Sequence, residues 1–377
     1  MTRKTIARIA PIDMVRGFAI LFALMSHALA QFAAQSIVLA DAKIWIKLLT
    51  RSATPMFFIV FGAMLHLVYL RKAKSEFDET REKLIARGLL CYVLFLGITF
   101  AAFVSGKHDA LFMAKSIVLL EADRFGTILA IYAVLFGIVA VTLRLALRFG
   151  VWFFAGIATA AWAANAALRM ASVPPVPGIQ QLIGHGEGLG PAILLTFTFV
   201  TFGVAIGEAW DRTRSWALPV SITIAALSAL IVAAIPDPDM TFLRSLVYEF
   251  RWQNHYAYYG YGIAMTAVFL VIGVLTDRRE PSIRPERGWL SRFGRETLFA
   301  FAAGNIVLNL LPEYRGVGWE GYSLAVVFVL GMWFVTLHKA SFTGFANRIS
   351  FGGVSGIASG YRGLSAMVGK LVLHFIR

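Results

Sequence analysis

An arginine and a histidine lie on one stripe of the first apolar segment of this chain. The segment PIDMVRGFAILFALMSHALA contains Arg16 and His27. Eleven residues at about 100° each make three helical turns plus about 20°, so the two side chains align about 16 Å apart along the axis. Asp13 falls near the same stripe. Ionisable groups inside a membrane helix are costly and usually mark a functional site. The alternative is that Asp13 and Arg16 are interfacial anchors and His27 makes a packing contact.

The composition excludes an ordinary soluble protein. Of 377 residues, 58% are hydrophobic and 15% are charged, with a mean hydropathy of +0.71, whereas soluble chains carry about 25% charge. The apolar segments are continuous rather than alternating, which predicts an all-α, polytopic membrane helical bundle. Cys91 is the single cysteine, so no intrachain disulfide can form. No zinc spacing or phosphate-binding loop occurs, and we expect no metal.

The apolar pattern predicts about ten membrane-spanning helices, because each needs about 20 apolar residues. The candidates lie near 11–32, 45–70, 86–105, 117–141, 151–170, 190–209, 216–235, 258–276, 296–312 and 320–338. We therefore expect a membrane bundle over residues 1–338. Residues 339–377 are rich in Gly and Ser and are expected to form an amphipathic cytoplasmic tail.

The basic residues predict the orientation of the bundle. The net charge of +14 is concentrated in the N-terminal tail, residues 71–87, residues 278–295 and the C-terminal tail. Cytoplasmic loops of membrane proteins are enriched in Lys and Arg, so both termini are expected in the cytoplasm. These basic loops would contact anionic membrane lipids, and they account for the charge without a nucleic-acid partner.

The first helix resembles that of the acyltransferase-3 family of membrane acyltransferases. The resemblance rests on Ile12-Asp13 followed by Arg16, ten further residues and His27. TPMFFIVFGAML is similar to the family's Phe-Phe-x-x-x-Gly stretch, and FGRETLFAFAAGNIVL is similar to its Leu-Gly-Arg-x-Ser-Leu helix start. Lysosomal-type glucosaminide acetyltransferases share a similar Asp-x-x-Arg-Gly start and a Phe-Gly second helix, so this family remains an alternative.

One later segment resembles the osmoregulated periplasmic glucan succinyltransferases. EADRFGTILAIYAVLFGI is similar to their Asp-x-x-Pro-x-Tyr helix, with Asp123 and Tyr132 in place and the proline absent. The ninth-helix histidine of the family is also absent, and Asn305 lies nearby. These departures leave the acceptor open.

The acyltransferase-3 resemblance implies transfer of a succinyl or acetyl group from cytoplasmic acyl-CoA to a hydroxyl of a periplasmic glycan. The protein would then be a multi-pass enzyme of a bacterial inner membrane. His27 suits a general base because imidazole titrates near neutral pH. Arg16, oriented by Asp13, would bind CoA phosphates. The candidates for completing a basic mouth are Lys83, Arg87 and Arg295, for which ordinary positive-inside charge is the alternative.

Two further segments are candidates on the outer side. Glu121, Asp123 and Arg124 would bind sugar hydroxyls or orient His27, unless they form an ion pair that seats the helix end. We assign catalytic roles to the two carboxylates and substrate binding, including a succinyl carboxylate, to Arg124. YEFRWQNHYAYYGYG alternates aromatic and polar residues. Its tyrosines are typical of an interfacial belt. The candidates for binding the acceptor are Trp252, Asn254 and His255, with Asn305 added from the later helix.

Two other functions stay open at this stage. A sugar N-acetyltransferase of the heparan-glucosaminide type needs the same base and the same bound thioester. A non-catalytic secondary transporter would also place Arg, His and Asp in its helices, although no repeated halves are visible. The sequence leaves the oligomeric state open, with a homo-oligomer among the alternatives.

Overall fold

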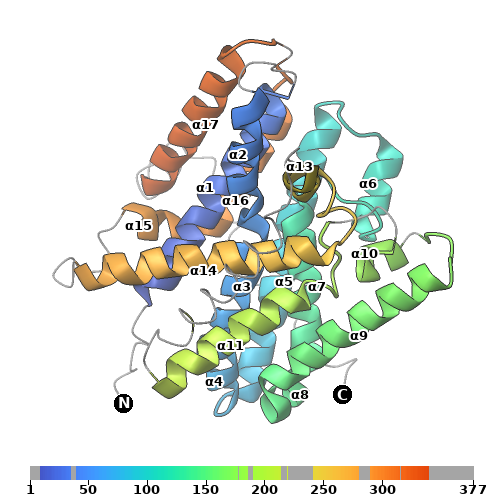
Figure 1. The fold of residues 1–377 in the computed structure, drawn as a ribbon, viewed down its shortest axis with the longest axis vertical. Coiled ribbons are helices and arrows are strands. Elements are labelled where there is room, and N and C mark those ends of the chain that lie inside the picture. Colours follow the sequence, from blue (N-terminus) through green and yellow to red (C-terminus); the bar gives the residue numbers. More distant parts are fainter. Residues whose placement is uncertain are drawn as a thin grey trace, which may run out of the picture.

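The computed structural model describes residues 9–34, 40–176, 178–185, 190–213, 219, 241–279, 289–314 and 316–338. Every regular element in these ranges is a helix, which confirms the all-α prediction (Figure 1). The predicted tail, 339–377, and the candidate span 216–235 lie wholly or almost wholly outside the described residues.

Helix α1, Ala10–Phe32, lies at the centre of the bundle. Its 23 residues begin beside Pro11 and are long enough to cross the apolar core of a bilayer. Six helices pack against it (Figure 1). They are α2 (Ala40–Arg51), α3 (Ala53–Met64), α14 (Tyr256–Arg279), α15 (Trp289–Arg295), α16 (Thr297–Leu310) and α17 (Glu320–Leu337). Side chains on α1 are thereby placed inside the protein rather than against lipid.

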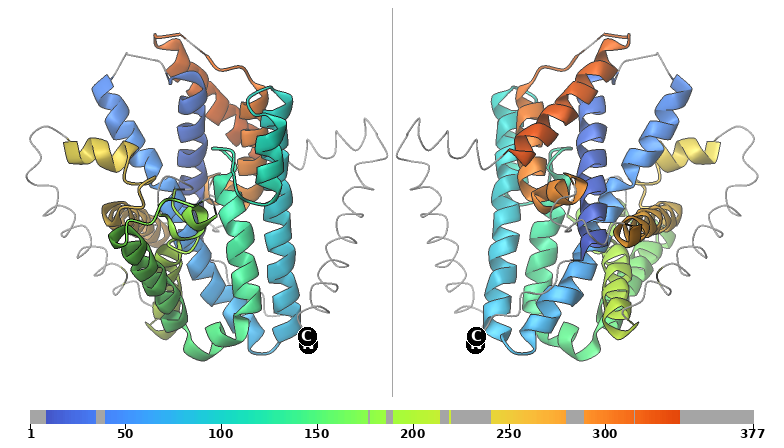
Figure 2. Two further views of the ribbon diagram at one scale, coloured as in Figure 1. Left: turned by 90° about the vertical axis from the view of Figure 1, so that its right-hand side faces the viewer. Right: turned by 90° about the vertical axis from the view of Figure 1, so that its left-hand side faces the viewer.

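A second group of helices surrounds this centre. Helix α5, Phe77–Val104, packs along α7, Thr127–Val141, and Figure 2 shows the two side by side. Helix α11, Phe197–Thr213, packs between α3 and α9, Val151–Met170. The shorter elements are the π-helix η1 (Leu65–Leu70), α4 (Arg71–Ala73), α6 (Ala110–Ile117), α8 (Leu143–Phe149), α10 (Ile179–Ile183) and α13 (Thr241–Tyr248).

Six described helices are long and apolar enough to cross a membrane. They are Ala10–Phe32, Ile44–Ala73, Phe77–Val104, Val151–Met170, Tyr256–Thr276 and Glu320–Leu337. A seventh span results if α7 and α8, bent by 73° relative to each other, count as one. These helices support a multi-pass membrane protein, while the orientation of the termini stays a prediction.

The predicted number of about ten spans is not confirmed among the described residues. Helix α16 has only 14 residues, about 21 Å, which is too short to cross a bilayer of about 30 Å. Helix α11 has 17 residues and ends in a charged turn that includes Glu208 and Asp211. The candidate 117–141 becomes helical again only at Thr127, after a polar turn. Hydropathy alone therefore counted buried, shorter helices as full spans.

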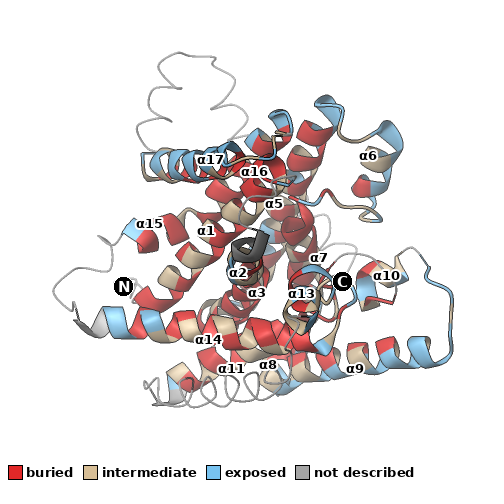
Figure 3. Ribbon diagram, turned by 45° about the horizontal axis from the view of Figure 1, so that its top comes forward, coloured by how far each residue is buried: buried red, intermediate tan, exposed pale blue. Residues whose placement is uncertain are grey.

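Burial distinguishes the centre from the rim (Figure 3). The span that contains α3 is mostly buried inside the protein, whereas only 22% of the α9 span and 28% of the α17 span are buried. Trp152 on α9 and Val327 on α17 are large apolar side chains that are 78% and 66% exposed. In a membrane these faces would contact lipid.

Close backbone contacts hold the inner helices together at glycines. A Cβ atom at Gly203 on α11 would overlap the carbonyl oxygen of Ile59 on α3, and one at Gly17 on α1 would overlap that of Leu290 on α15. Small residues at helix crossings are typical of membrane bundles. These positions therefore set the distance of α11 from α3 and that of α15 from α1, the helix that carries Arg16 and His27.

The Gly203→Ala substitution is expected to destabilise the protein, because the added methyl group must separate α11 from α3. Overpacking of this kind costs roughly 1–3 kcal/mol. Gly156→Ala on the exposed face of α9 is the matched control, since nothing lies within 4 Å of the new methyl group and alanine favours helix. Thermal unfolding in detergent should show a lower Tm for Gly203→Ala only. Equal changes in both variants would contradict this account.

Candidate functional site

His27 on α1 is held by an asparagine from α16. Its Nδ1 lies 2.7 Å from the Oδ1 atom of Asn305. An amide oxygen only accepts hydrogen bonds, so Nδ1 carries the ring proton and Nε2 keeps a free lone pair. In this tautomer Nε2 is the nitrogen that can accept a proton, as a general base must. Nδ2 of Asn305 is buried and has no hydrogen-bond partner among the described residues.

Two phenylalanines enclose the His27 ring. The ring centroid of Phe125 lies 4.8 Å away, and that of Phe301 lies 5.9 Å away. Phe301 also meets Phe57 at 6.0 Å. These contacts leave the imidazole half-buried in an aromatic environment, which limits the positions it can take.

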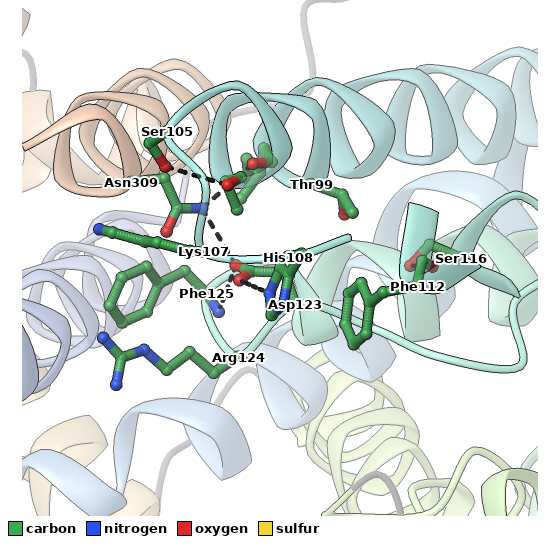
Figure 4. Close-up of polar contacts among 12 residues, drawn as sticks. Thr99, Ser105, Lys107, His108, Phe112, Ser116, Asp123, Arg124, Phe125 and Asn309 are labelled. Carbon is green, nitrogen blue, oxygen red and sulfur yellow. Dashed lines mark hydrogen bonds and ion pairs between the residues drawn. The ribbon is translucent and has the colours of Figure 1, made fainter. Parts of the chain in front are cut away.

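Asp123 is the centre of a buried polar network next to this pair (Figure 4). Its carboxylate accepts hydrogen bonds from His108 Nε2 at 3.0 Å, from Asn309 Nδ2 at 3.2 Å and from the Phe125 backbone amide at 2.9 Å. Burial alone would raise the pKa of Asp123, but these hydrogen bonds outweigh burial and hold the pKa below its ordinary value. The network fixes the turn that presents Phe125 to His27.

Helix α16 connects the network to the histidine. Asn305 and Asn309 are four residues apart, so they lie on the same face of the helix. One contacts His27 and the other contacts both Asp123 and the carbonyl oxygen of Ile98 on α5. The short helix thereby positions α1, α5 and the turn before α7 relative to one another.

A cavity of about 280 Å³ opens on one side of His27, and we call it the His27 cavity. Four of its lining residues are basic, Trp252 adds an aromatic wall, and no Asp or Glu among the described residues lines it. The basic residues are Lys47, Arg51, Arg124 and Arg251. Arg124 is paired, because it donates to Glu313 at 3.1 Å and to Gln31 at 3.2 Å.

A second cavity of about 270 Å³ contains Arg16 and Arg87, and we call it the Arg16 cavity. Arg16 lies 3.5 Å from Asp13, as the sequence predicted. The remaining wall is mostly apolar and aromatic, with Phe57, Tyr132 and Phe301 among its residues. Phe301 thus lines the Arg16 cavity and also contacts the His27 ring.

Three predicted residues lie away from both cavities. Lys83 pairs with Glu79 on an exposed part of α5. Arg295 is half-buried on α15 and lines neither cavity. Glu121 is half-buried and lies 3.7 Å from Lys115; it lines a separate cavity with Trp252. The structure does not bring Glu121 to His27.

Of the residues predicted to bind the acceptor, one lines the His27 cavity and the others do not. Trp252 lines the His27 cavity. The Asn254 side chain is 2% exposed, and its Oδ1 accepts hydrogen bonds from the Ala192 backbone amide and the Tyr259 hydroxyl. His255 stacks on Phe250 with 4.1 Å between ring centroids. Asn254 and His255 therefore hold the turn around Trp252, and Asn305 contacts the histidine instead of an open cavity.

Several polar residues of the site were missed from the sequence. Arg51 and Arg251 line the His27 cavity, His108 and Asn309 bind Asp123, and Lys107 contacts Gln31 on α1 at 3.3 Å. Gln31 offered a signal, since it is a buried polar residue one turn after His27. Within the described ranges, no cluster of three His, Cys, Asp or Glu side chains suited to a metal ion occurs.

The Asp123→Asn substitution is expected to remove part of the acid sensitivity of folding. A carboxylate whose pKa is depressed stabilises the fold above its unfolded-state pKa of about 3.9, and this contribution is lost as pH falls through the lower folded-state pKa. At pH 7 the variant should lose roughly 1–3 kcal/mol, and its stability should fall less than that of the wild type in acid. Thermal unfolding between pH 7 and pH 3 measures both effects. The control is Glu121→Gln, a nearby carboxylate outside the Asp123 network. An identical pH dependence of Asp123→Asn and wild type would contradict this role of Asp123.

One family model matches this chain. Residues 8–185 match the catalytic domain described as heparan-alpha-glucosaminide N-acetyltransferase. The matched part contains α1 with Arg16 and His27, Arg87 and the Asp123 turn. No curated protein and no solved structure matches significantly. The match indicates an acetyltransferase-type membrane enzyme, in agreement with the alternative that the first helix left open. The resemblances to acyltransferase-3 and to the glucan succinyltransferases stay predictions.

Proposed function

We propose that the chain is an integral membrane acyltransferase that moves an acetyl or succinyl group from acyl-CoA to a sugar. The observation that carries this proposal is the position of His27, which lines one basic cavity and is separated by Phe301 from another. A donor held on one side and an acceptor on the other would meet at the imidazole. The family match to a sugar N-acetyltransferase catalytic domain supports the same reaction class.

The Arg16 cavity suits the donor. Arg16 and Arg87 supply cations for the phosphates of CoA, and the apolar wall suits the pantetheine arm. A volume of about 270 Å³ is small for a whole nucleotide cofactor. We therefore expect the nucleotide to stay at the mouth while the acyl-pantetheine arm extends toward His27. The helical distance of about 16 Å between Arg16 and His27 matches such an arm.

The chemistry follows from the tautomer of His27. Nε2 accepts the proton of the sugar nucleophile while its oxygen or nitrogen attacks the thioester carbonyl, and a tetrahedral intermediate forms. When the C–S bond breaks, the acyl group stays on the sugar and the thiolate of CoA takes the proton back from Nε2. Asn305 acts as a positioning residue, because its Oδ1 keeps the proton on Nδ1 and the ring in place.

The His27 cavity suits the acceptor. Trp252 offers a flat aromatic face for a sugar ring, and the basic side chains around it bind oxygens. A hydroxyl of a periplasmic glycan is the acceptor that the acyltransferase-3 resemblance implies, with the protein in a bacterial inner membrane. An amino sugar is the second candidate, and the matched family favours it. Comparison of glucose with glucosamine as acceptors distinguishes the two.

The His27→Ala substitution is expected to abolish acyl transfer. Detergent-purified protein would receive acetyl-CoA or succinyl-CoA together with a sugar acceptor, and CoA release would be followed by a thiol reagent. Loss of the general base should slow release by about 10²–10⁴-fold. The control is Arg148→Gln, an exposed residue on α8. Absence of thiol release by the wild type with either donor would favour the secondary transporter instead.

The Asn305 variants test how His27 is positioned. Asn305→Ala should lower kcat roughly 10- to 100-fold with little change in KM for the donor, because the ring loses its fixed tautomer but the Arg16 cavity is intact. Asn305→Asp keeps an oxygen acceptor toward Nδ1, so it should retain more activity, with a shifted pH profile. Steady-state kinetics over pH measures this. Equal losses in both variants, with unchanged pH profiles, would contradict the positioning role.

A further inference from the structure

Two arginines of the His27 cavity come from separate elements. Arg51 ends α2, and Arg251 lies in the turn between α13 and α14. The Nε atom of Arg51 donates to the carbonyl oxygen of Val247 at 2.7 Å, and that of Arg251 donates to the carbonyl oxygen of Gly190. Each guanidinium group is therefore held in place by the hydrogen bond from its Nε atom. Among the described residues, their terminal nitrogens make no hydrogen bond, so they are available to a ligand.

These two cations lack a counter-ion among the described residues. Arg124 pairs with Glu313, whereas neither Arg51 nor Arg251 makes an ion pair. Both are half-buried, and the charge of Arg251 acts on Arg51 and on His27. Like charges held together in a partly buried site are unfavourable unless an anion joins them. Two uncompensated cations that line one cavity are thus the arrangement of a binding site whose ligand supplies the negative charge.

We infer that Arg51 and Arg251 form an anion subsite beside His27, which binds a carboxylate, phosphate or sulfate group of the substrate. The inference rests on the proposed function and names its substrate class. The anion has two sources: the terminal carboxylate of a succinyl group, or an acidic substituent on the sugar acceptor. The sequence assigned the succinyl carboxylate to Arg124, but Arg124 already binds Glu313 and Gln31.

A crossed assay distinguishes the two sources. Acetyl-CoA and succinyl-CoA are each combined with glucuronic acid and with glucuronamide, its neutral analogue. The anionic substrate should have the higher kcat/KM by about tenfold or more, the effect of one charge-assisted hydrogen bond. A preference between donors identifies the acyl carboxylate as the ligand, and a preference between sugars identifies the acceptor. No preference on either axis would overturn the inference.

Substitutions of the two arginines test whether they bind the anion. Arg51→Gln and Arg251→Gln should each lose about tenfold or more in kcat/KM for the preferred anionic substrate and much less for its neutral counterpart. Arg148→Gln, exposed on α8, is the control. An equal loss for charged and neutral substrates would contradict the assignment. If the Gln variants fail to fold, Arg51→Lys and Arg251→Lys keep the charge, and the wild-type preference alone still decides.

Ligand-dependent stability separates this inference from the proposed function. The Tm of the wild type is measured with glucuronate, glucuronamide, succinyl-CoA and acetyl-CoA. Stabilisation by an anionic ligand that is lost in Arg51→Gln and Arg251→Gln, without CoA release from any donor, would support the subsite and refute the acyltransferase. CoA release without any effect of anionic charge on rate or Tm would support the acyltransferase and refute the subsite.

Discussion

Polar side chains inside an apolar bundle need hydrogen-bond partners from the protein. For His27, the histidine between the two cavities, that partner is Asn305. This hydrogen bond joins the central helix α1 to the short helix α16 and sets the tautomer of the imidazole. The same face of α16 binds Asp123 through Asn309. Because Phe125 follows this turn and contacts the His27 ring, the position of the histidine depends on the whole network.

The basic residues of the bundle differ in how their charge is compensated. Arg16 has Asp13, Lys83 has Glu79, and Arg124 has Glu313. Arg51 and Arg251 each donate one hydrogen bond, from Nε to a backbone carbonyl oxygen, and have no acidic partner among the described residues. A paired arginine is held by the fold, whereas an uncompensated one beside a cavity is suited to a ligand. This difference, more than the number of cations, locates the inferred anion subsite.

The sequence predicted the relative positions of side chains that lie on the same helix. Arg16, His27 and Asp13 required only the helical repeat, and the Asp13–Arg16 contact is present. The number of about ten spans is not confirmed, because hydropathy does not distinguish a membrane-crossing helix from a shorter apolar one such as α16. The partners of His27 and Asp123 come from residues up to 278 positions away in the chain, and no local pattern encodes such contacts. Asn254 was predicted to bind substrate, but its amide is engaged with the backbone of a distant turn.

The proposed mechanism requires an acyl group to pass from one side of the bundle to the other at His27. Sealed proteoliposomes test this passage, with radiolabelled acetyl-CoA or succinyl-CoA outside and a sugar acceptor trapped inside. We expect acylated sugar in the lumen and CoA retained outside, in wild-type vesicles and not in His27→Ala vesicles. Acylated sugar only when donor and acceptor share one compartment, or none at all, would contradict it.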